Sequence, residues 1–217
     1  MKKAVLFDLD GTLVDSSEGI TKSVQYALKH FGIEENDLSK LQVFIGPPLG
    51  ESFMRYYGFS KEQADEGIRV YRERYKPIGI FECKLYPGVR ECIMQLRKQG
   101  YLIGVASSKP EKFCKMILEH FDVLSLFDDV VGATEDGSIG TKEEVLKEVM
   151  RRWADIPKEN MCLIGDTIFD VEGANLVGIS AIGVSFGFGD IDEMMRAGAK
   201  GICNHMTDLP VMIEKFI

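Results

Sequence analysis

The feature that most restricts the fold of this chain is a repeated alternation of short apolar runs with longer helical patterns. Short apolar runs such as residues 4–7 are typical of buried strands. Strands that alternate with helices along a chain form a parallel sheet with helices packed against it. We therefore expect an α/β fold whose core is a Rossmann-like parallel sheet.

The predicted strands and helices follow this alternation over most of the chain. We expect strands at residues 4–7, 102–106, 130–131, 161–164, 181–184 and 201–203. We expect helices at residues 89–99, 111–120, 142–153, 170–177 and 191–197. Glycine follows three of these helices, at Gly100, Gly178 and Gly198, as helix C-termini prefer.

One long region interrupts the alternation. Between residues 15 and 81 the sequence shows helical patterns without a convincing strand, at residues 17–31, 49–57 and 61–76. We therefore expect a catalytic core formed by residues 1–14 and 82–217, with an all-helical cap domain, residues 15–81, inserted after the first strand. The polar residues 15–17 and the Leu-Tyr-Pro-Gly stretch at residues 85–88 are plausible hinges.

Length and charge narrow the class of protein. With 217 residues the chain can bury a sizeable core without disulfides or a structural metal, and its five cysteines have no metal-binding spacing, which predicts reduced thiols. The net charge of -8 argues against a general binder of nucleic acid or anionic membranes. No apolar run reaches the roughly 18 residues of a membrane helix, and the N-terminal one is too short for a signal peptide. We expect a cytoplasmic protein, a monomer or weak homodimer, that acts on a small molecule.

Polar residues gather just after the predicted strands. In open α/β sheets ligands bind outside the carboxyl ends of the strands, so these residues are the candidates for a site. They are Asp8, Asp10, Gly11 and Thr12 after the first strand, Ser107, Ser108 and Lys109 after the second, Lys142 beyond the third, and Gly165, Asp166 and Asp170 after the fourth.

The four aspartates in this set, Asp8, Asp10, Asp166 and Asp170, predict a metal site. Carboxylates that converge on one edge of a sheet repel one another unless a cation lies among them. Oxygen ligands without histidine or thiolate favour Mg²⁺. Taken singly, each aspartate would more often be a helix cap or a turn residue, and it is their clustering that favours metal.

Lys142 supplies the opposite charge. The stretch Thr141-Lys142-Glu143-Glu144 has the spacing of a capping box, which places Lys142 in the first turn of a helix, where the helix dipole disfavours a cation. An anion would relieve this conflict, and phosphate is the obvious one. A single lysine is more often a solvated surface residue; the company of Asp8, Ser107 and Asp166 favours the phosphate interpretation.

Together these motifs resemble a known family. The stretch FDLDGT, the strand ending in Ser107, the later Lys142 and GDTIFD at residues 165–170 are similar to the four ordered motifs of the haloacid dehalogenase superfamily of phosphatases. The resemblance spans nearly the whole chain. It includes a helical cap and the Tyr-Pro-Gly-Val stretch, residues 86–89, at which the chain returns from the cap to the core. Within the superfamily the chain is most similar to the phosphoglycolate phosphatase group.

The resemblance implies a role for each motif residue. Asp8 would be the nucleophile that forms an aspartyl-phosphate, and Asp10 the general acid and base. Ser107 and Lys142 would hold the transferring phosphoryl group. The implied ligands of Mg²⁺ are Asp166, Asp8 and the main-chain carbonyl of Asp10, with Asp170 orienting metal-bound water from outside the ligand set.

Two departures from the family pattern keep alternatives open. Ser107-Ser108-Lys109 stands where the group often has Thr-Asn-Lys, a change that keeps the hydroxyl. Lys142 lacks the proline that often follows the lysine of the third motif, so Lys109 competes with it as the phosphate-binding lysine. Lys142 is preferred because it lies between the second and fourth motifs at a helix start.

The substrate would be chosen by the cap. The stretch Ile45-Gly46-Pro47-Pro48-Leu49 is the best candidate for a loop that approaches the substrate, since prolines stiffen it and Gly46 permits close approach; a plain turn between helices is the alternative. We predict substrate contacts from Gly46 and Pro47, and from Gly11, Thr12 and Ser108 in the core.

The predicted activity is Mg²⁺-dependent hydrolysis of a small phosphomonoester, such as a phosphoglycolate-like compound, a sugar phosphate or a nucleoside monophosphate. A phosphomutase similar to β-phosphoglucomutase would share all four motifs. A haloacid dehalogenase would not be expected to carry Asp10. A non-catalytic phospho-acceptor signalling module also places acids, a hydroxyl and a lysine at a sheet edge, but the chain length, the helical insertion and the D-x-D-G-T pattern disfavour it.

Overall fold

The computed structural model describes residues 2–134 and 136–217. These residues form two compact units. The first runs up to Val14 and continues with Leu85–Ile217, and the second is Asp15–Lys84. Each unit has its own packed interior, so each is described by itself.

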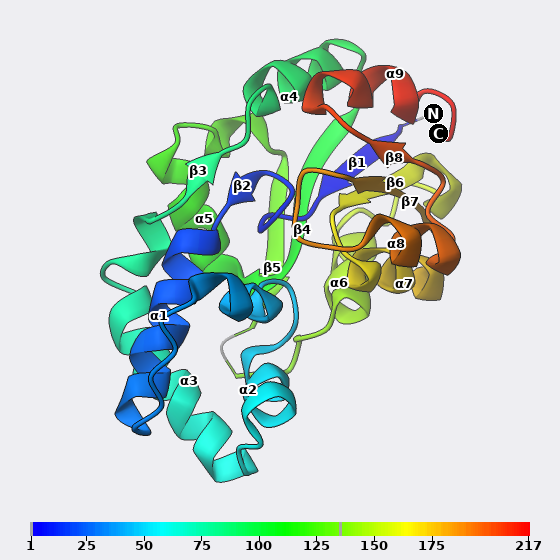
Figure 1. Cartoon of the computed structure of the whole chain (residues 1–217). Helices are drawn as coiled ribbons and strands as arrows, with labels where there is room; N and C mark the ends of the chain where they lie inside the picture. The colour runs from blue at the N-terminus through cyan, green and yellow to red at the C-terminus, as the bar shows by residue number, and fades with distance from the viewer. Residues whose placement is uncertain (1, 135) are drawn as a thin grey trace. The chain divides into compact units, whose positions relative to one another are not determined.

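The first unit is built on one six-stranded parallel sheet with the strand order β5-β4-β1-β6-β7-β8 (Figure 1). Its strands are β1 (Ala4–Phe7), β4 (Leu102–Pro110), β5 (Asp129–Ala133), β6 (Met161–Gly165), β7 (Ser180–Val184) and β8 (Ile202–Cys203). The predicted parallel α/β core is confirmed.

The register of the central strands aligns the residues that follow them. Phe7 of β1 pairs with Val105 of β4 and with Ile164 of β6. The next residue, Asp8, continues this alignment, because its backbone N–H donates to the Ile164 oxygen at 2.8 Å. All four residues of β1 are buried, as a strand between two others requires. The motif residues after β1, β4 and β6 therefore meet at one edge of the sheet.

Helices pack on the sheet and complete the first unit. They are α4 (Val89–Lys98), α5 (Glu111–His120), α6 (Lys142–Arg152), α7 (Ile168–Val177), α8 (Ile191–Ala197) and α9 (Leu209–Ile213), with short 3₁₀ turns at Leu124–Leu126, Lys158–Asn160 and Met206–Asp208. One apolar cluster joins Val145 of α6, Val171 of α7 and Met194 of α8 to Leu6 and Leu163 of the strands. These three helices accordingly lie together on one side of the sheet in Figure 1.

The second unit contains the helices α1 (Ser17–His30), α2 (Leu49–Tyr57) and α3 (Lys61–Tyr75) and the 3₁₀ turns Leu38–Phe44 and Gly79–Phe81. Ser60 and Gln63 form a capping box that starts α3. The rings of Phe44 and Phe59 each lie against Phe53, with centroids 5.0 and 5.5 Å apart. Aromatic packing of this kind buries a large apolar area.

The boundary of the second unit differs from the predicted one. It extends to Lys84 rather than ending at residue 81. Glu82 explains the difference, because its backbone oxygen accepts from Gly19 N at 2.9 Å and its carboxylate pairs with both terminal nitrogens of Arg74 at 2.7 and 3.0 Å. The contact between Gly19 and Glu82 joins distant parts of the sequence and so leaves no local pattern.

Short elements also escape prediction. Strands β2 (Val14–Asp15) and β3 (Lys84–Leu85) form a two-stranded sheet where the chain leaves and re-enters the first unit, and α9 is a further element without a predicted counterpart. Two-residue strands are too short to show an alternating pattern.

The five cysteines are free, as predicted. Within residues 2–134 and 136–217, the structure contains no helix with both the length and the apolar character needed to cross a membrane.

Candidate active site

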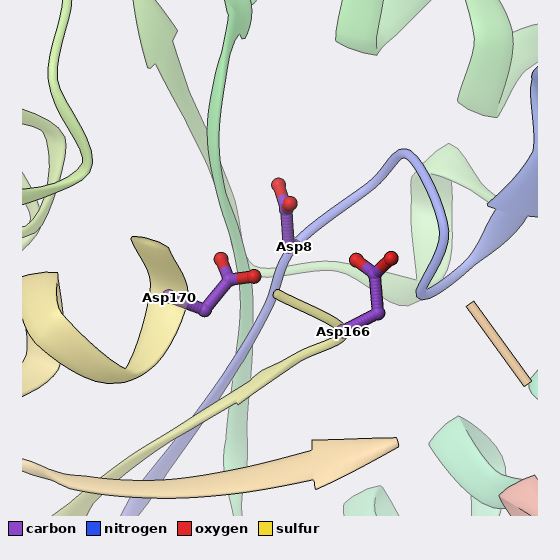
Figure 2. A group of neighbouring side chains, drawn as sticks. All are labelled: Asp8, Asp166 and Asp170. Carbon is purple, nitrogen blue, oxygen red and sulfur yellow. The ribbon is translucent and has the colours of Figure 1, made fainter. Parts of the chain in front are cut away.

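Three buried aspartates form a compact acidic group at the sheet edge (Figure 2). Asp8 follows β1, Asp166 follows β6 and Asp170 lies in the first turn of α7. One carboxylate oxygen from each lies within 4.8 Å of the others. Of the four predicted aspartates, the structure therefore brings three together at their carboxylates.

Lys142 completes this group. Its Nζ lies 2.9 Å from Asp8 Oδ1 and 2.8 Å from Asp170 Oδ1, and it donates to the Ala106 oxygen at 2.9 Å. The side chain is only 5% exposed. The capping box expected at Thr141 forms and sets Lys142 as the first residue of α6. The cation at this helix start is thus balanced by two carboxylates of the protein.

Asp170 is fully engaged within the protein. Its Oδ2 accepts from the backbone N–H and the hydroxyl of Thr167, at 3.0 and 2.8 Å, while its Oδ1 faces Lys142. Both oxygens therefore have partners, which makes Asp170 a counter-ion that holds Lys142 in place.

The buried charges of this group shift one another's pKa values. Burial is the largest effect on Asp8 and raises its pKa to about 6, against the opposing charge of Lys142. Burial, followed by the charges of Asp170 and Asp8, raises the pKa of Asp166 well above its usual range. Burial alone would lower the pKa of Lys142, but Asp170 and Asp8 outweigh it and raise that pKa. Burial thus dominates the pKa shifts of the two aspartates, and neighbouring carboxylates dominate that of Lys142.

Asp10 lies beside a different lysine. Lys109 Nζ donates to Asp10 Oδ2 and Oδ1 at 2.8 and 3.0 Å, and the two side chains are 8% and 12% exposed. The Asp10 carboxylate is not part of the acidic group found among the described residues. The structure thus pairs Lys142 with the predicted nucleophile Asp8 and Lys109 with the predicted acid and base.

The remaining predicted residues of the core surround these charges. Ser107 is 2% exposed, hydrogen-bonds Asp8, and accepts from the backbone N–H of Lys109 at 3.3 Å. Thr12 is buried and its hydroxyl donates to Asp166 Oδ1 at 3.3 Å. Ser108 follows Ser107 in β4 and is half-buried.

Two predicted substrate residues lie outside this unit. Gly46 and Pro47 belong to the second unit, where Gly46 has φ 101°. A positive φ at this position suits glycine, which has no Cβ to oppose it. Their predicted contact with substrate stays a prediction.

One element of the site is not among the residues predicted from the sequence. The loop that follows β7 reaches Asp166, and the backbone N–H of Phe188 donates to Asp166 Oδ2 at 2.8 Å. The position after a parallel strand is itself a signal for a site, and it applies to β7 as it does to β1, β4 and β6. The residue type gives no such signal, because a backbone donor is the same in every residue but proline.

Comparison with known proteins agrees with this geometry. A family model described as haloacid dehalogenase-like hydrolase matches residues 5–184. The chain belongs to the haloacid dehalogenase-like hydrolases. The family predicted from the motifs is confirmed, and phosphoglycolate phosphatases are among the relatives that match over most of the chain.

Individual relatives of this hydrolase are similar over almost its whole length. A 5'-nucleotidase from Pseudomonas aeruginosa is 39% identical over 97% of the chain and 95% of that protein. Tyrosine-protein kinase PtkA from Mycobacterium tuberculosis is 38% identical over 94% of the chain and 69% of that protein. A crystal structure of a predicted phosphatase from Clostridium acetobutylicum has a TM-score of 0.94 and 44% identity, covering 99% of this chain and 100% of that one. The enzyme is a phosphatase of this family, as predicted.

Proposed function

We propose that this hydrolase is a Mg²⁺-dependent phosphatase that removes phosphate from a small phosphomonoester through an aspartyl-phosphate on Asp8. The observation that carries the proposal is that the buried carboxylate of Asp8, at the end of the central strand, pairs with Lys142 and lies beside Asp166. A nucleophilic carboxylate needs positive charge beside it when it approaches a phosphate dianion. The site supplies one cation and the ligands for another.

The donor set fits Mg²⁺. Asp8, Asp166 and Asp170 offer carboxylate oxygens, which hard divalent cations prefer. Three carboxylates and the ammonium of Lys142 leave a formal charge of −2, which one divalent cation would neutralise. We assign the metal to Asp8, Asp166 and the main-chain carbonyl of Asp10, the ligand set that the family resemblance implies, and Asp170 to the role of counter-ion for Lys142.

The first chemical step is a displacement at phosphorus. Bound Mg²⁺ would withdraw charge from the phosphoryl oxygens and so admit an anionic nucleophile. A carboxylate oxygen of Asp8 forms a bond to phosphorus while the bond between phosphorus and the leaving oxygen breaks. Lys142 offsets the negative charge of both partners, and Ser107 donates its hydroxyl hydrogen to a phosphoryl oxygen.

Asp10 carries the protons in both steps. It protonates the leaving alkoxide, and then accepts a proton from the water that attacks the aspartyl-phosphate and releases inorganic phosphate. Lys109 holds the Asp10 carboxylate by both oxygens in the structure, which sets its direction. Backbone and hydroxyl groups of Gly11, Thr12 and Ser108 complete the proposed substrate site.

The proposed substrates are a nucleoside monophosphate, a sugar phosphate and a phosphoglycolate-like ester. The 5'-nucleotidase from Pseudomonas aeruginosa, which is similar over nearly its full length, supports the first of these. A phosphomutase would use the same core groups but pass the phosphoryl group to a sugar hydroxyl instead of to water. Release of inorganic phosphate, measured against sugar phosphate isomerisation, separates the two.

The test is a steady-state assay of phosphate release across a panel of phosphorylated metabolites. We expect turnover with Mg²⁺, none with EDTA, and recovery when Mg²⁺ is restored. Asp8→Asn should abolish turnover while its melting temperature shows that the protein stays folded. The exposed Asp192→Asn is the matched control and should retain full activity. Undiminished turnover by Asp8→Asn would overturn the assigned mechanism.

A further inference from the structure

The loop that follows β7 lies directly against a carboxylate of the proposed metal site. We call residues 185–189, Ser-Phe-Gly-Phe-Gly, the β7 strap. Within it, the backbone N–H of Phe188 donates to Asp166 Oδ2 at 2.8 Å. Asp166 Oδ1 faces the Thr12 hydroxyl at 3.3 Å. The two oxygens of this carboxylate are therefore held from two different loops.

Glycines make this close approach possible. A Cβ added to Gly187 would lie within 3.0 Å of both the Cβ and Oδ2 of Asp166 and of the Gly11 oxygen. A Cβ added to Gly189 would come equally close to the backbone oxygen of Asp166. On the other side, a Cβ on Gly11 would meet the same carboxylate. Asp166 thus lies between two stretches of bare backbone that leave its side chain little room to rotate.

The β7 strap is itself anchored at its first two residues. Ser185 N donates to the Cys203 oxygen at 3.1 Å, and the Ser185 hydroxyl donates to Asn204 Oδ1 at 2.8 Å. The ring of Phe186 packs on Tyr86 with centroids 4.9 Å apart. The strap is therefore held by the end of β8, by Asn204 and by the segment that precedes α4, so its first two residues are fixed on two sides.

We propose that the β7 strap is a positioning element for the metal ligand Asp166, acting through the Phe188 N–H and the bare backbone of Gly187. The proposal rests on the proposed function, because it concerns the cation that the function requires. Partners that orient a metal-binding carboxylate are typically worth about 10–100-fold in metal affinity. A strap that only closed the end of the sheet would affect stability and leave metal affinity alone.

The decisive variant is Gly187→Ala. Its added methyl group displaces either the strap, which breaks the Phe188 hydrogen bond, or the Asp166 side chain. We expect the dissociation constant for Mn²⁺, measured on the folded protein by electron paramagnetic resonance of free Mn²⁺, to rise about 10–100-fold. The Mg²⁺ concentration for half-maximal activity should rise in parallel, with kcat largely recovered at saturating metal.

Two matched variants separate the backbone effect from other causes. Phe188→Ala keeps the N–H and removes only the ring, so its Mn²⁺ affinity should equal that of the unmodified protein. Gly140→Ala adds a methyl group where no atom lies within 4 Å and should likewise leave affinity unchanged. If Gly187→Ala fails to fold, Phe186→Ala loosens the strap without adding an atom near Asp166, and its dissociation constant should also rise.

The outcomes distinguish the strap from the proposed function. If Gly187→Ala binds Mn²⁺ with the same dissociation constant as the unmodified protein, the positioning role is overturned and the phosphatase proposal stays intact. Where Gly187→Ala does not fold, the same holds for an unchanged dissociation constant in Phe186→Ala. A loss with Phe188→Ala as large as that with Gly187→Ala would also overturn the positioning role, because the ring would then be responsible. No binding of Mn²⁺ or Mg²⁺ by the unmodified protein would refute the proposed function itself.

Discussion

Replacing Asp166 by asparagine should stabilise the metal-free enzyme. The change removes one negative charge from the buried acidic group while it keeps the size of the side chain and an oxygen that can accept from Phe188 N. Asp166 is fully buried, so its charge cannot be relieved by water. A residue proposed to bind metal is thus expected to cost stability when metal is absent.

The magnitude follows from the spacing of the carboxylates. At the upper limit of this spacing, 4.8 Å, two unit charges repel by about 3.5 kcal/mol at an effective dielectric constant of about 20. The positive charge of Lys142 and the spread of each charge over two oxygens reduce this figure. We expect Asp166→Asn to raise the free energy of unfolding of the metal-free protein by about 1–3 kcal/mol at pH 8.

The sign of the pH dependence follows from the pKa shifts. The pKa of Asp166 in the folded protein lies well above its unfolded value, so its ionisation destabilises the fold above that folded pKa. The penalty is full above the raised pKa, shrinks as the pH falls below it because the folded state takes up a proton, and vanishes near the unfolded pKa of about 4. The neighbouring Asp8 titrates in the same way, with a pKa of about 6. The advantage of Asp166→Asn should therefore shrink from pH 8 towards pH 5.

The assay is thermal unfolding in EDTA at both pH values, repeated with Mg²⁺. A domain of this size shifts its melting temperature by about 2–4 °C per kcal/mol, so a rise of about 2–12 °C is expected at pH 8. Mg²⁺ should raise the melting temperature of the unmodified protein and not that of the variant. The exposed Asp192→Asn should leave the melting temperature unchanged, both in EDTA and with Mg²⁺. An Asp166→Asn variant less stable than the unmodified protein in EDTA at pH 8 would refute the electrostatic argument.

Two further predictions concern the lysines. Lys142→Met removes the cation that faces Asp8 and leaves the buried carboxylates uncompensated. We expect loss of turnover, and a free energy of unfolding, measured by urea denaturation, that is lower by about 3–5 kcal/mol. A decrease no larger than that of the exposed Lys147→Met would contradict this prediction. Lys109→Met releases the Asp10 carboxylate and should lower kcat more than it changes KM, whereas Lys109→Arg keeps a two-pronged ion pair and should retain more activity. Equal activity of the two Lys109 variants would show that the pair does not orient Asp10.

Local patterns in the sequence determined the elements and their order. The predicted bounds of β1, α2, α5 and α8 coincide with those of the structure, because apolar runs, capping residues and terminal glycines act within a few residues of one another. The rule that parallel strands end at one edge of a sheet was enough to place Asp8 and Asp166 in one site, although 157 residues separate them in the chain.

The tertiary structure alone decided how the charges are paired. Lys142 and Lys109 are both plausible from the sequence, and only the path of α6 brings Lys142 to Asp8, which lies far away in the chain. The same holds for the link between Lys109 and Asp10, and for the backbone N–H of Phe188 on Asp166. Periodicity and capping patterns report only short-range geometry. The partner of a buried charge depends instead on packing between distant segments, and a backbone donor cannot be recognised from the residue type.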